Sequence, residues 1–231
     1  MRAHGALAAA APRRLVLFDL DGTLIDSEPG IMESIHHAFT AIGAPVPPYE
    51  VLRSWIGPPF YQSFPTALDH DAERVEAAIG KYREHYEAGA WQRHAIYPGI
   101  DAAIAALDAA GCALAVVTTK IFRQARRIVD HLPFGAAFTR VYGADLKTSH
   151  SAKAQMIAQA MADFGVAAER TAMVGDRHFD IDGARANGVR AVGVGWGFGS
   201  VDELRAAGAD EIAAAPSDLV GLLLAEPAAQ R

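Results

Sequence analysis

The sequence has little cysteine and no long apolar run, and each shortage excludes a class of protein. Its 231 residues include a single cysteine, Cys112, which lies in an apolar stretch and cannot form an internal disulfide bond. We expect a small buried side chain there, and such cysteine usage favours a reducing, cytoplasmic setting. No apolar run approaches the ~18 residues that a membrane-spanning helix needs, so we expect no membrane partner.

Positive charge is also scarce, with 21 Lys and Arg against 27 Asp and Glu and a net charge of −6. A broad basic surface for nucleic acid is therefore not expected. Hydrophobic residues make up 51% of the chain and charged residues 21%, which is typical of a globular protein. The length suits one large domain, or one domain with a sizeable insertion. Composition leaves open whether the protein is a monomer or a homodimer.

The first residues are rich in alanine and end at the pair Arg13-Arg14, and an export signal is one interpretation of this pattern. The apolar stretch before the pair is short, and the one after it reaches Asp19 within four residues. We therefore expect residues 1–13 to form a disordered tail.

The most informative stretch is residues 15–24, where four apolar residues are followed by Asp19-Leu20-Asp21-Gly22-Thr23. The apolar run predicts a strand buried on both faces, as in the middle of a parallel sheet. The two carboxylates then lie just past its carboxyl end, where open α/β sheets bind their ligands. Buried carboxylates need a cation or a proton. This indicates a divalent metal, a shared proton or both, whereas the simplest alternative is a polar turn without chemistry.

The rest of the chain divides into two patterns. Residues 27–94 show helical spacing and no convincing strand, with helices expected near residues 31–42, 51–56, 61–68 and 72–88. From residue 95 onward, helices alternate with short apolar runs that predict strands at 112–118, 138–142, 171–174, 189–194 and 211–212. This alternation predicts an α/β fold with a doubly wound, Rossmann-like parallel sheet and an inserted all-helical domain.

Three of the predicted strands end in polar residues of different kinds: the two aspartates, Thr118 with Thr119, and Gly175 with Asp176. Parallel strands share one edge for their carboxyl ends, so these groups can meet. Carboxylate oxygens are ligands suited to Mg²⁺, and a carboxylate can attack phosphorus to form an aspartyl-phosphate. A second carboxylate can protonate the leaving oxygen, while a hydroxyl and a lysine hold the phosphoryl oxygens.

Four motifs in order resemble those of the haloacid dehalogenase-like hydrolase superfamily. They are residues 19–23, Val116-Val117-Thr118-Thr119-Lys120, Lys153, and Gly175-Asp176-Arg177-His178-Phe179-Asp180. The helical insertion between the first two motifs resembles the C1 cap of the phosphoglycolate phosphatase-like branch. The resemblance implies a hydrolase core domain in residues 14–26 and 95–231 and a helical cap domain in residues 27–94.

The resemblance also implies a role for each motif residue. Asp19 would be the nucleophile and a metal ligand, and Asp21 the general acid/base that also offers its backbone carbonyl to the metal. Thr118, Thr119 and Lys153 would bind the substrate phosphate, and Lys153 would also offset the charge of Asp19. Asp176 would bind Mg²⁺, with Asp180 as a further ligand or beside it. An aspartate at position 21 favours phosphate esters over halogenated substrates, whose leaving group needs no proton.

The resulting hypothesis is a Mg²⁺-dependent phosphatase for a small phosphomonoester such as phosphoglycolate, a nucleotide or a sugar phosphate. The alternatives are a phosphomutase of the same superfamily and a noncatalytic phosphate-binding regulatory protein. Several residues also have a purely structural interpretation: Lys153 as a solvated helix lysine and Asp180 as a first-turn acid. The roles of residues 57–59 and of Trp196 and Phe198, as site or packing residues, remain open at this point.

Overall fold

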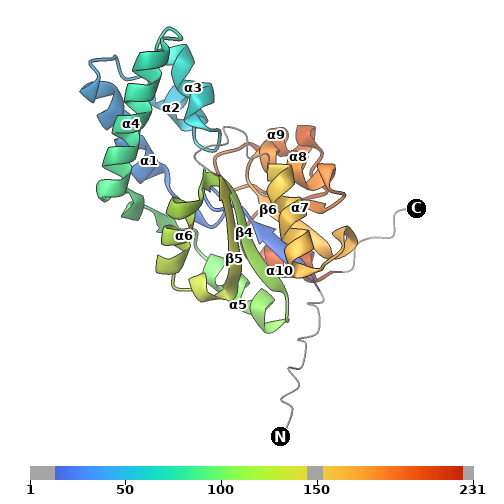
Figure 1. The fold of residues 1–231 in the computed structure, drawn as a ribbon. Helices are drawn as coiled ribbons and strands as arrows, with labels where there is room; N and C mark the ends of the chain where they lie inside the picture. Colours follow the sequence, from blue (N-terminus) through green and yellow to red (C-terminus); the bar gives the residue numbers. More distant parts are fainter. Residues whose placement is uncertain (1–13, 145–152, 226–231) are drawn as a thin grey trace, which may run out of the picture.

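The structure, a computed structural model, describes residues 14–144 and 153–225. Its centre is a six-stranded sheet in the order β5-β4-β1-β6-β7-β8, in which every neighbouring pair is parallel (Figure 1). The strands are β1 (Leu15–Phe18), β4 (Ala113–Ile121), β5 (Phe138–Ala144), β6 (Thr171–Gly175), β7 (Arg190–Val194) and β8 (Glu211–Ala213). This confirms the predicted doubly wound parallel sheet.

Strand β1 lies in the middle of the sheet, and all four of its side chains are buried. Val16 and Phe18 pack on one face with helices α5 (Ile100–Ala109), α6 (Phe122–His131) and α10 (Asp218–Leu224). Leu15 and Leu17 pack on the other face with α7 (Lys153–Phe164), α8 (His178–Ala186) and α9 (Val201–Ala207). The uninterrupted apolar run is therefore explained by two cores, one on each face of the sheet.

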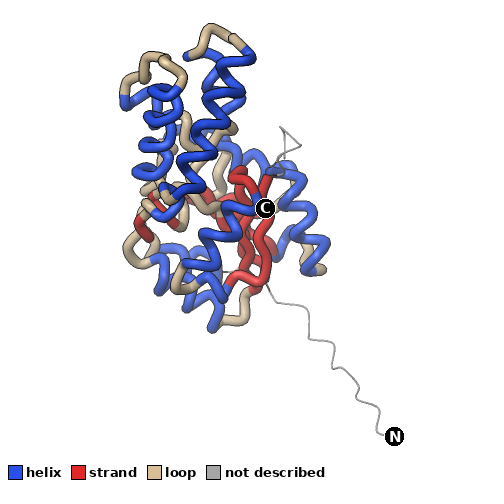
Figure 2. The backbone as a smooth tube through the Cα atoms, turned by 60° about the vertical axis from the view of Figure 1, so that its left-hand side comes forward, coloured by secondary structure: helices blue, strands red, loops and turns tan. Residues whose placement is uncertain are grey.

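A helical segment is inserted between β1 and the rest of the sheet. It contains α1 (Glu28–Ala41), α2 (Tyr49–Ser54), α3 (Phe60–Ala67), α4 (Ala72–Ala88) and the 3₁₀ turn η1 (Ala90–Gln92). Figure 2 shows this segment standing to one side of the sheet and its covering helices. Its interior is aromatic, with the Phe64 ring 5.2 Å from that of Phe39 and 5.5 Å from that of Trp55.

The chain enters and leaves the helical segment through two adjacent connections. A short antiparallel pair joins β2 (Ile25–Asp26) to β3 (Ala95–Ile96), which the sequence pattern did not predict. Two further 3₁₀ turns, η2 (Gly135–Ala137) and η3 (Ala168–Arg170), precede β5 and β6. The paired connections form a double strand between the helical segment and the sheet.

Some boundaries differ from the predicted ones. Strand β4 continues to Ile121, beyond the predicted end at residue 118, so Thr119 as well as Thr118 lies within the strand. Helix α8 begins at His178, which places Asp180 in its first turn. Cys112 is buried and free, as expected. The predicted tail, residues 1–13, lies outside the described residues.

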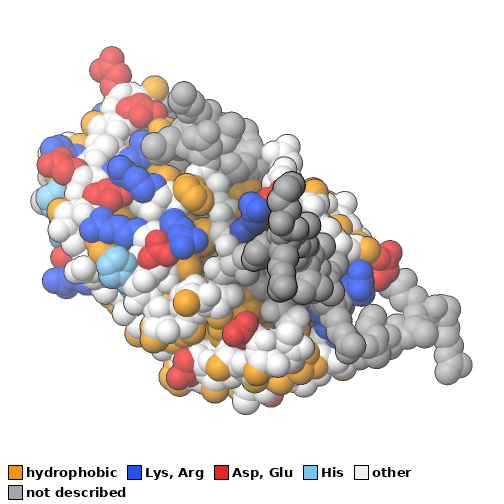
Figure 3. All heavy atoms as spheres, turned by 60° about the horizontal axis from the view of Figure 1, so that its bottom comes forward, with side chains coloured by type: hydrophobic (Ala, Val, Ile, Leu, Met, Phe, Trp, Pro, Cys, Tyr) orange, Lys and Arg blue, Asp and Glu red, His pale blue; other side chains and the backbone are white. Residues whose placement is uncertain are grey.

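The distribution of charged and apolar side chains on the surface is relevant to whether nucleic acid or a membrane is a partner. Figure 3 shows basic, acidic and apolar side chains interspersed over the described part of one face. Within the described ranges, no helix combines the length and the apolar character needed to cross a membrane.

Two helical glycines of the inserted segment give a matched test of its packing. A Cβ at Gly30 in α1 would lie 2.2 Å from the carbonyl oxygen of Ala90, whereas one at Gly80 in α4 would meet nothing within 4 Å. Alanine is favoured over glycine in a helix by about 1 kcal/mol. We predict that Gly80→Ala raises the free energy of unfolding by roughly 0.5–1 kcal/mol, while Gly30→Ala lowers it. Denaturant unfolding measures both, and a stabilising Gly30→Ala would contradict the described contact between α1 and η1.

Candidate active site

The candidate site is formed where three neighbouring strands end. Asp19 follows β1 directly, and Asp176 follows β6 directly. Thr118, in β4, lies two residues beyond Val116, which pairs with Phe18 of β1. Because these strands are parallel and adjacent, residues from distant parts of the chain meet at one edge of the sheet.

Three buried carboxylates form the centre of the site. Asp19, Asp176 and Asp180 each offer an oxygen within 4.8 Å of the others, and the exposed fraction is 5% for Asp19 and 0% for the other two. Burial, together with the neighbouring carboxylates, raises the pKa of Asp176 to about 8. Burial also raises the pKa of Asp180, although Lys153 opposes the shift. Such a group is stabilised by protons or by a cation.

The donor set fits a hard divalent cation. All three groups are carboxylates, which are the preferred ligands of Mg²⁺ and Ca²⁺. The Asp176 carboxylate is also held from outside the cluster: the backbone N–H of Phe198 donates to Oδ2 at 2.8 Å, and Thr23 Oγ1 lies 3.3 Å from Oδ1. The cluster therefore combines hard oxygen ligands with fixed orientations.

Gly22 is required where the first motif approaches this cluster. Its backbone has a φ of +82°, and a Cβ there would lie 2.2 Å from Asp176 Oδ2. The loop after β7 packs on the same place, since the indole N–H of Trp196 donates to the carbonyl of Thr23 at 3.1 Å. Trp196 and Phe198 therefore lie beside the acidic cluster and help to position it.

Lys153 neutralises part of the acidic cluster. Its side chain is buried at the start of α7, and its Nζ contacts the carboxylate of Asp180 and lies 3.0 Å from Asp19 Oδ2. Burial alone would lower the pKa of Lys153, but Asp180 and Asp19 raise it. The lysine is therefore a charged member of the site rather than a solvated helix residue. Asp180 also accepts from the backbone N–H of Arg177 at 3.0 Å, so it caps α8 as well.

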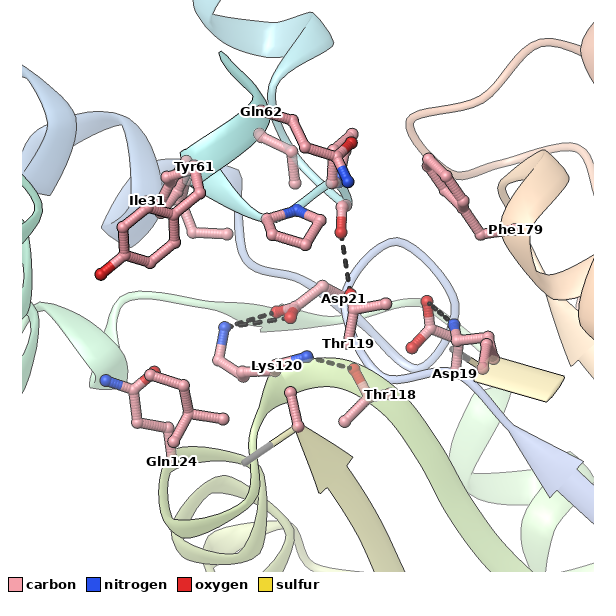
Figure 4. Close-up of a pocket in the computed structure, with 18 of the residues that line it drawn as sticks. Asp19, Asp21, Ile31, Tyr61, Gln62, Thr118, Thr119, Lys120, Gln124 and Phe179 are labelled. Carbon is pink, nitrogen blue, oxygen red and sulfur yellow. Dashed lines mark hydrogen bonds and ion pairs between the residues drawn. The ribbon is translucent and has the colours of Figure 1, made fainter. Parts of the chain in front are cut away.

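Asp21 has a different partner. Both of its carboxylate oxygens accept from Lys120, at 3.1 and 3.0 Å, and both side chains are largely buried (Figure 4). The Lys120 ammonium also lies 4.8 Å from the ring centre of Tyr86 in α4. Burial lowers the pKa of Lys120, but Asp21, together with Tyr86 and Tyr82, raises it above its ordinary value. The Asp21 side chain thus stands apart from the three-carboxylate cluster, in contact with a lysine that lies against the helical segment.

Lys120 is a site residue that the sequence analysis did not assign. The only available signal was its place directly after Thr118-Thr119 in the second motif. A lysine after a strand is also common on a solvated surface, and its pairing with Asp21 joins residues 99 positions apart. This contact depends on the tertiary structure.

The two threonines of β4 are used differently. Thr118 is buried, and its Oγ1 accepts from the backbone N–H of Lys120 at 3.2 Å. Thr119 Oγ1 donates to the carbonyl of Gly57 at 2.8 Å, which joins the sheet to the loop before α3. The guanidinium of Arg177 also donates to the carbonyl of Ile56 in that loop. Residues 56–57 therefore contact the sheet edge at Thr119 and the start of α8 at Arg177.

A cavity of about 540 Å³ lies between the helical segment and the edge of the sheet. From the sheet side it is lined by Asp19, Asp21, Thr118, Thr119, Lys120 and Lys153, and from the helical segment by side chains of α1, α3 and α4. Asp180 contacts the lining residue Lys153, and Asp176 has an oxygen within 4.8 Å of an oxygen of Asp19, which also lines the cavity. Among the described histidines, none belongs to the group of carboxylates that could hold a metal.

Known proteins resemble this chain over most of its length. The haloacid dehalogenase-like hydrolase family matches residues 16–194. Tyrosine-protein kinase PtkA of Mycobacterium tuberculosis is 42% identical over 189 residues, which are 82% of this chain and 64% of that protein. The chain thus spans just under two thirds of that relative. A 5'-nucleotidase of Pseudomonas aeruginosa is 39% identical over 191 residues, 83% of this chain and 86% of the relative.

Other relatives and a solved structure extend the same pattern. A phosphoglycolate phosphatase of Pseudomonas fluorescens is 30% identical over 192 residues, 80% of this chain and 70% of the relative. The crystal structure of a predicted phosphatase from Clostridium acetobutylicum superposes with a TM-score of 0.85 at 33% identity, covering 92% of this chain and 99% of that one. The family match, the parallel sheet and the order of the four motifs agree: the chain belongs to the haloacid dehalogenase-like hydrolase family.

Proposed function

We propose that the protein is a Mg²⁺-dependent phosphatase that hydrolyses a small phosphomonoester through an aspartyl-phosphate on Asp19. The observation that carries the proposal is the cluster of Asp19, Asp176 and Asp180 with Lys153 at the floor of the cavity. Family membership and relatives named as phosphatases support a phosphoric monoester hydrolase. The relative named as a tyrosine kinase is longer than this chain, and we do not propose kinase activity for this chain.

Asp19 is the proposed nucleophile. Its Oδ1 accepts from the backbone N–H of Leu20 at 2.8 Å, and its Oδ2 lies 3.0 Å from Lys153 Nζ. These contacts orient the carboxylate toward Lys153. In the first step an Asp19 oxygen bonds to phosphorus while the bond from phosphorus to the ester oxygen breaks.

Asp21 is the proposed general acid and base. It lines the cavity beside Asp19 and would give a proton to the departing alcohol oxygen. In the second step a water attacks phosphorus and gives its proton to Asp21, and the bond to Asp19 breaks to release inorganic phosphate. Lys120, which bridges both Asp21 oxygens, is then a positioning residue for this acid.

The phosphate would be bound by Thr118 and Lys153, with Thr119 beside them. Asp19, Asp176 and Asp180 are the residues that would hold Mg²⁺, with the backbone carbonyl of Asp21 as a further ligand implied by the family resemblance. When bound, the ion would offset phosphate charge and orient the ester. The positive charge of Lys153 reduces the electrostatic repulsion between the carboxylates of Asp19 and Asp180.

We also propose that residues 27–94 act as a cap domain over a core formed by residues 14–26 and 95–231. Its contacts with the core through Ile56 and Gly57 lie above the site and would help to exclude water when the cavity closes. A cytoplasmic location is part of this proposal, in line with one buried, free cysteine.

Phosphate release from a panel of phosphomonoesters, with Mg²⁺ and with a chelator, tests the proposal. Mg²⁺-dependent release supports a phosphatase. A phosphomutase would instead depend on a bisphosphate activator and retain the phosphoryl group in its product. A protein that binds phosphate analogues without any turnover would be a regulatory binding protein.

The first prediction concerns the nucleophile. Asp19→Asn should lower kcat by about a thousandfold or more, the scale seen when a nucleophile is removed, while thermal unfolding shows an intact fold. The matched control is Asp202→Asn, at an aspartate whose side chain is 95% exposed; it should keep wild-type kcat. Near wild-type turnover by Asp19→Asn would exclude the mechanism.

The second prediction concerns Lys120. Lys120→Met should impair substrates that need a protonated leaving group, by roughly a hundredfold for alkyl phosphates, the lower end of a general acid's contribution. It should affect p-nitrophenyl phosphate, whose leaving group needs little protonation, by much less. Lys81→Met, at an exposed lysine of α4, is the control and should change neither rate. Equal losses on both substrates would show that Lys120 does not act through Asp21.

The third prediction concerns metal and pH. Without metal, folded Asp176 keeps its proton up to about pH 8, whereas its ordinary pKa is 3.8. Between pH 3.8 and about pH 8 the Asp176 carboxyl is protonated in the folded state and ionised in the unfolded state. The contribution of this group to the free energy of unfolding therefore falls as the pH rises. Mg²⁺ takes the place of protons. We predict that Mg²⁺ raises Tm more at pH 8 than at pH 5.

Differential scanning calorimetry with a chelator and with Mg²⁺ measures this difference. Asp176→Asn should remove most of the Mg²⁺-dependent rise in Tm, and Asp202→Asn should retain it. An unchanged rise in Asp176→Asn would place the metal elsewhere.

A further inference from the structure

The cavity above Asp19 and Asp21 is larger than the phosphate site requires. Its volume of about 540 Å³ lies within the range of roughly 300–1,000 Å³ that accommodates drug-sized ligands. A compact ester such as phosphoglycolate has only a two-carbon acid beyond its phosphate. The volume therefore indicates a substrate with a larger group attached to the ester oxygen.

The part of the cavity formed by the helical segment is apolar and aromatic. Ile31, Phe60, Tyr61, Ile79 and Tyr82 line it from α1, α3 and α4. In Figure 4, Ile31 and Tyr61 lie on one side of the space above Asp21, and Phe179 of the sheet domain lies on the opposite side. Flat apolar walls of this kind favour a planar ring over a short charged chain.

Two of these aromatic residues differ in how firmly they are held. Phe60 is half-buried, with its ring 4.8 Å from that of Phe64 and 4.4 Å from that of Tyr82. Tyr61 follows it in the first turn of α3 and remains 40% exposed. Its ring lies 6.0 Å from the Arg83 guanidinium. Phe60 is therefore part of an aromatic wall, and Tyr61, with Arg83 over its ring, is the more exposed of these two cavity-lining aromatic residues.

The polar groups on this side are also suited to a ring that carries heteroatoms. Gln62 and Arg83 line the cavity, and Figure 4 shows Gln62 above Asp21. An amide both donates and accepts hydrogen bonds. The other lining cations, Lys120 and Lys153, already contact carboxylates. Arg83 is the lining cation from the helical segment that could instead bind the carboxylate of a compact acid.

We infer that this wall selects phosphomonoesters that carry a planar aromatic ring, with Tyr61 as the specificity-determining residue. The inference rests on the proposed phosphatase function and names its substrate class. The ring can belong to a nucleoside 5'-monophosphate, which places a ribose between ring and phosphate, or to an aryl phosphate, which does not.

The test compares kcat/KM for adenosine 5'-monophosphate, phenyl phosphate, phosphoglycolate and glycerol 3-phosphate. We expect at least one aromatic ester to exceed both compact esters by about tenfold or more, the effect of one base–aromatic stacking contact. The better of the two aromatic esters identifies the source of the ring. Preference for either compact ester would overturn the inference.

Single substitutions then test whether Tyr61 causes the preference for aromatic esters. Tyr61→Leu should reduce kcat/KM for the preferred aromatic ester by about tenfold, mainly through KM, and change the compact esters by less than about twofold. Tyr49→Leu is the matched control, since Tyr49 is also an exposed tyrosine of the helical segment and does not line the cavity. Arg83→Gln should leave the aromatic preference in place. A loss confined to phosphoglycolate in Arg83→Gln, with none in Tyr61→Leu, would overturn the inference.

Acetyl phosphate is a reactive phosphate without a ring. Its hydrolysis therefore tests the proposed phosphatase function independently of the preference for aromatic esters. Its Asp19-dependent hydrolysis without any aromatic preference would overturn the inference alone. If no compound were hydrolysed, the proposed function would fail. Calorimetric binding to Asp19→Asn gives the same comparison without turnover: about tenfold tighter binding of the aromatic ester supports the inference, and equal or weaker binding contradicts it.

Discussion

The structure depends on three carboxylates and one lysine buried together at the edge of a parallel sheet. Asp19, Asp176 and Asp180 repel one another, and their burial removes the water that would otherwise stabilise their charges. Lys153 supplies one compensating charge, which leaves the cluster with an excess of negative charge. This imbalance is the main physical support for the proposed cation site at the edge of the sheet.

The surrounding elements hold this cluster in place from several directions. The backbone of Phe198 and the hydroxyl of Thr23 fix Asp176, and Gly22 allows the first motif to approach it closely. On the other side, Lys120 joins Asp21 to the aromatic face of Tyr86. The helical segment therefore contacts the candidate site through the charged side chain of Lys120 and through the backbone carbonyls of residues 56 and 57.

Much of this arrangement could be predicted from the sequence, because it follows from local patterns. The buried run before Asp19, the alternation of strands and helices, and the polar residues at strand ends predicted the parallel sheet and the meeting of Asp19, Thr118 and Asp176. Long-range contacts could not be predicted in this way. The pairing of Lys120 with Asp21, the support from Phe198 and the anchoring of Ile56 by Arg177 each join segments far apart in sequence. The extension of β4 beyond Thr118 also lacked a local signal.

In the proposed mechanism phosphorus is attacked twice, first by Asp19 and then by water. Its most direct test is the stereochemistry of hydrolysis of a phosphorothioate monoester made chiral at phosphorus with oxygen isotopes, carried out in isotopically labelled water. Each in-line displacement inverts phosphorus, so two displacements predict overall retention of configuration. Inversion would show a single direct attack by water and would contradict a covalent role for Asp19.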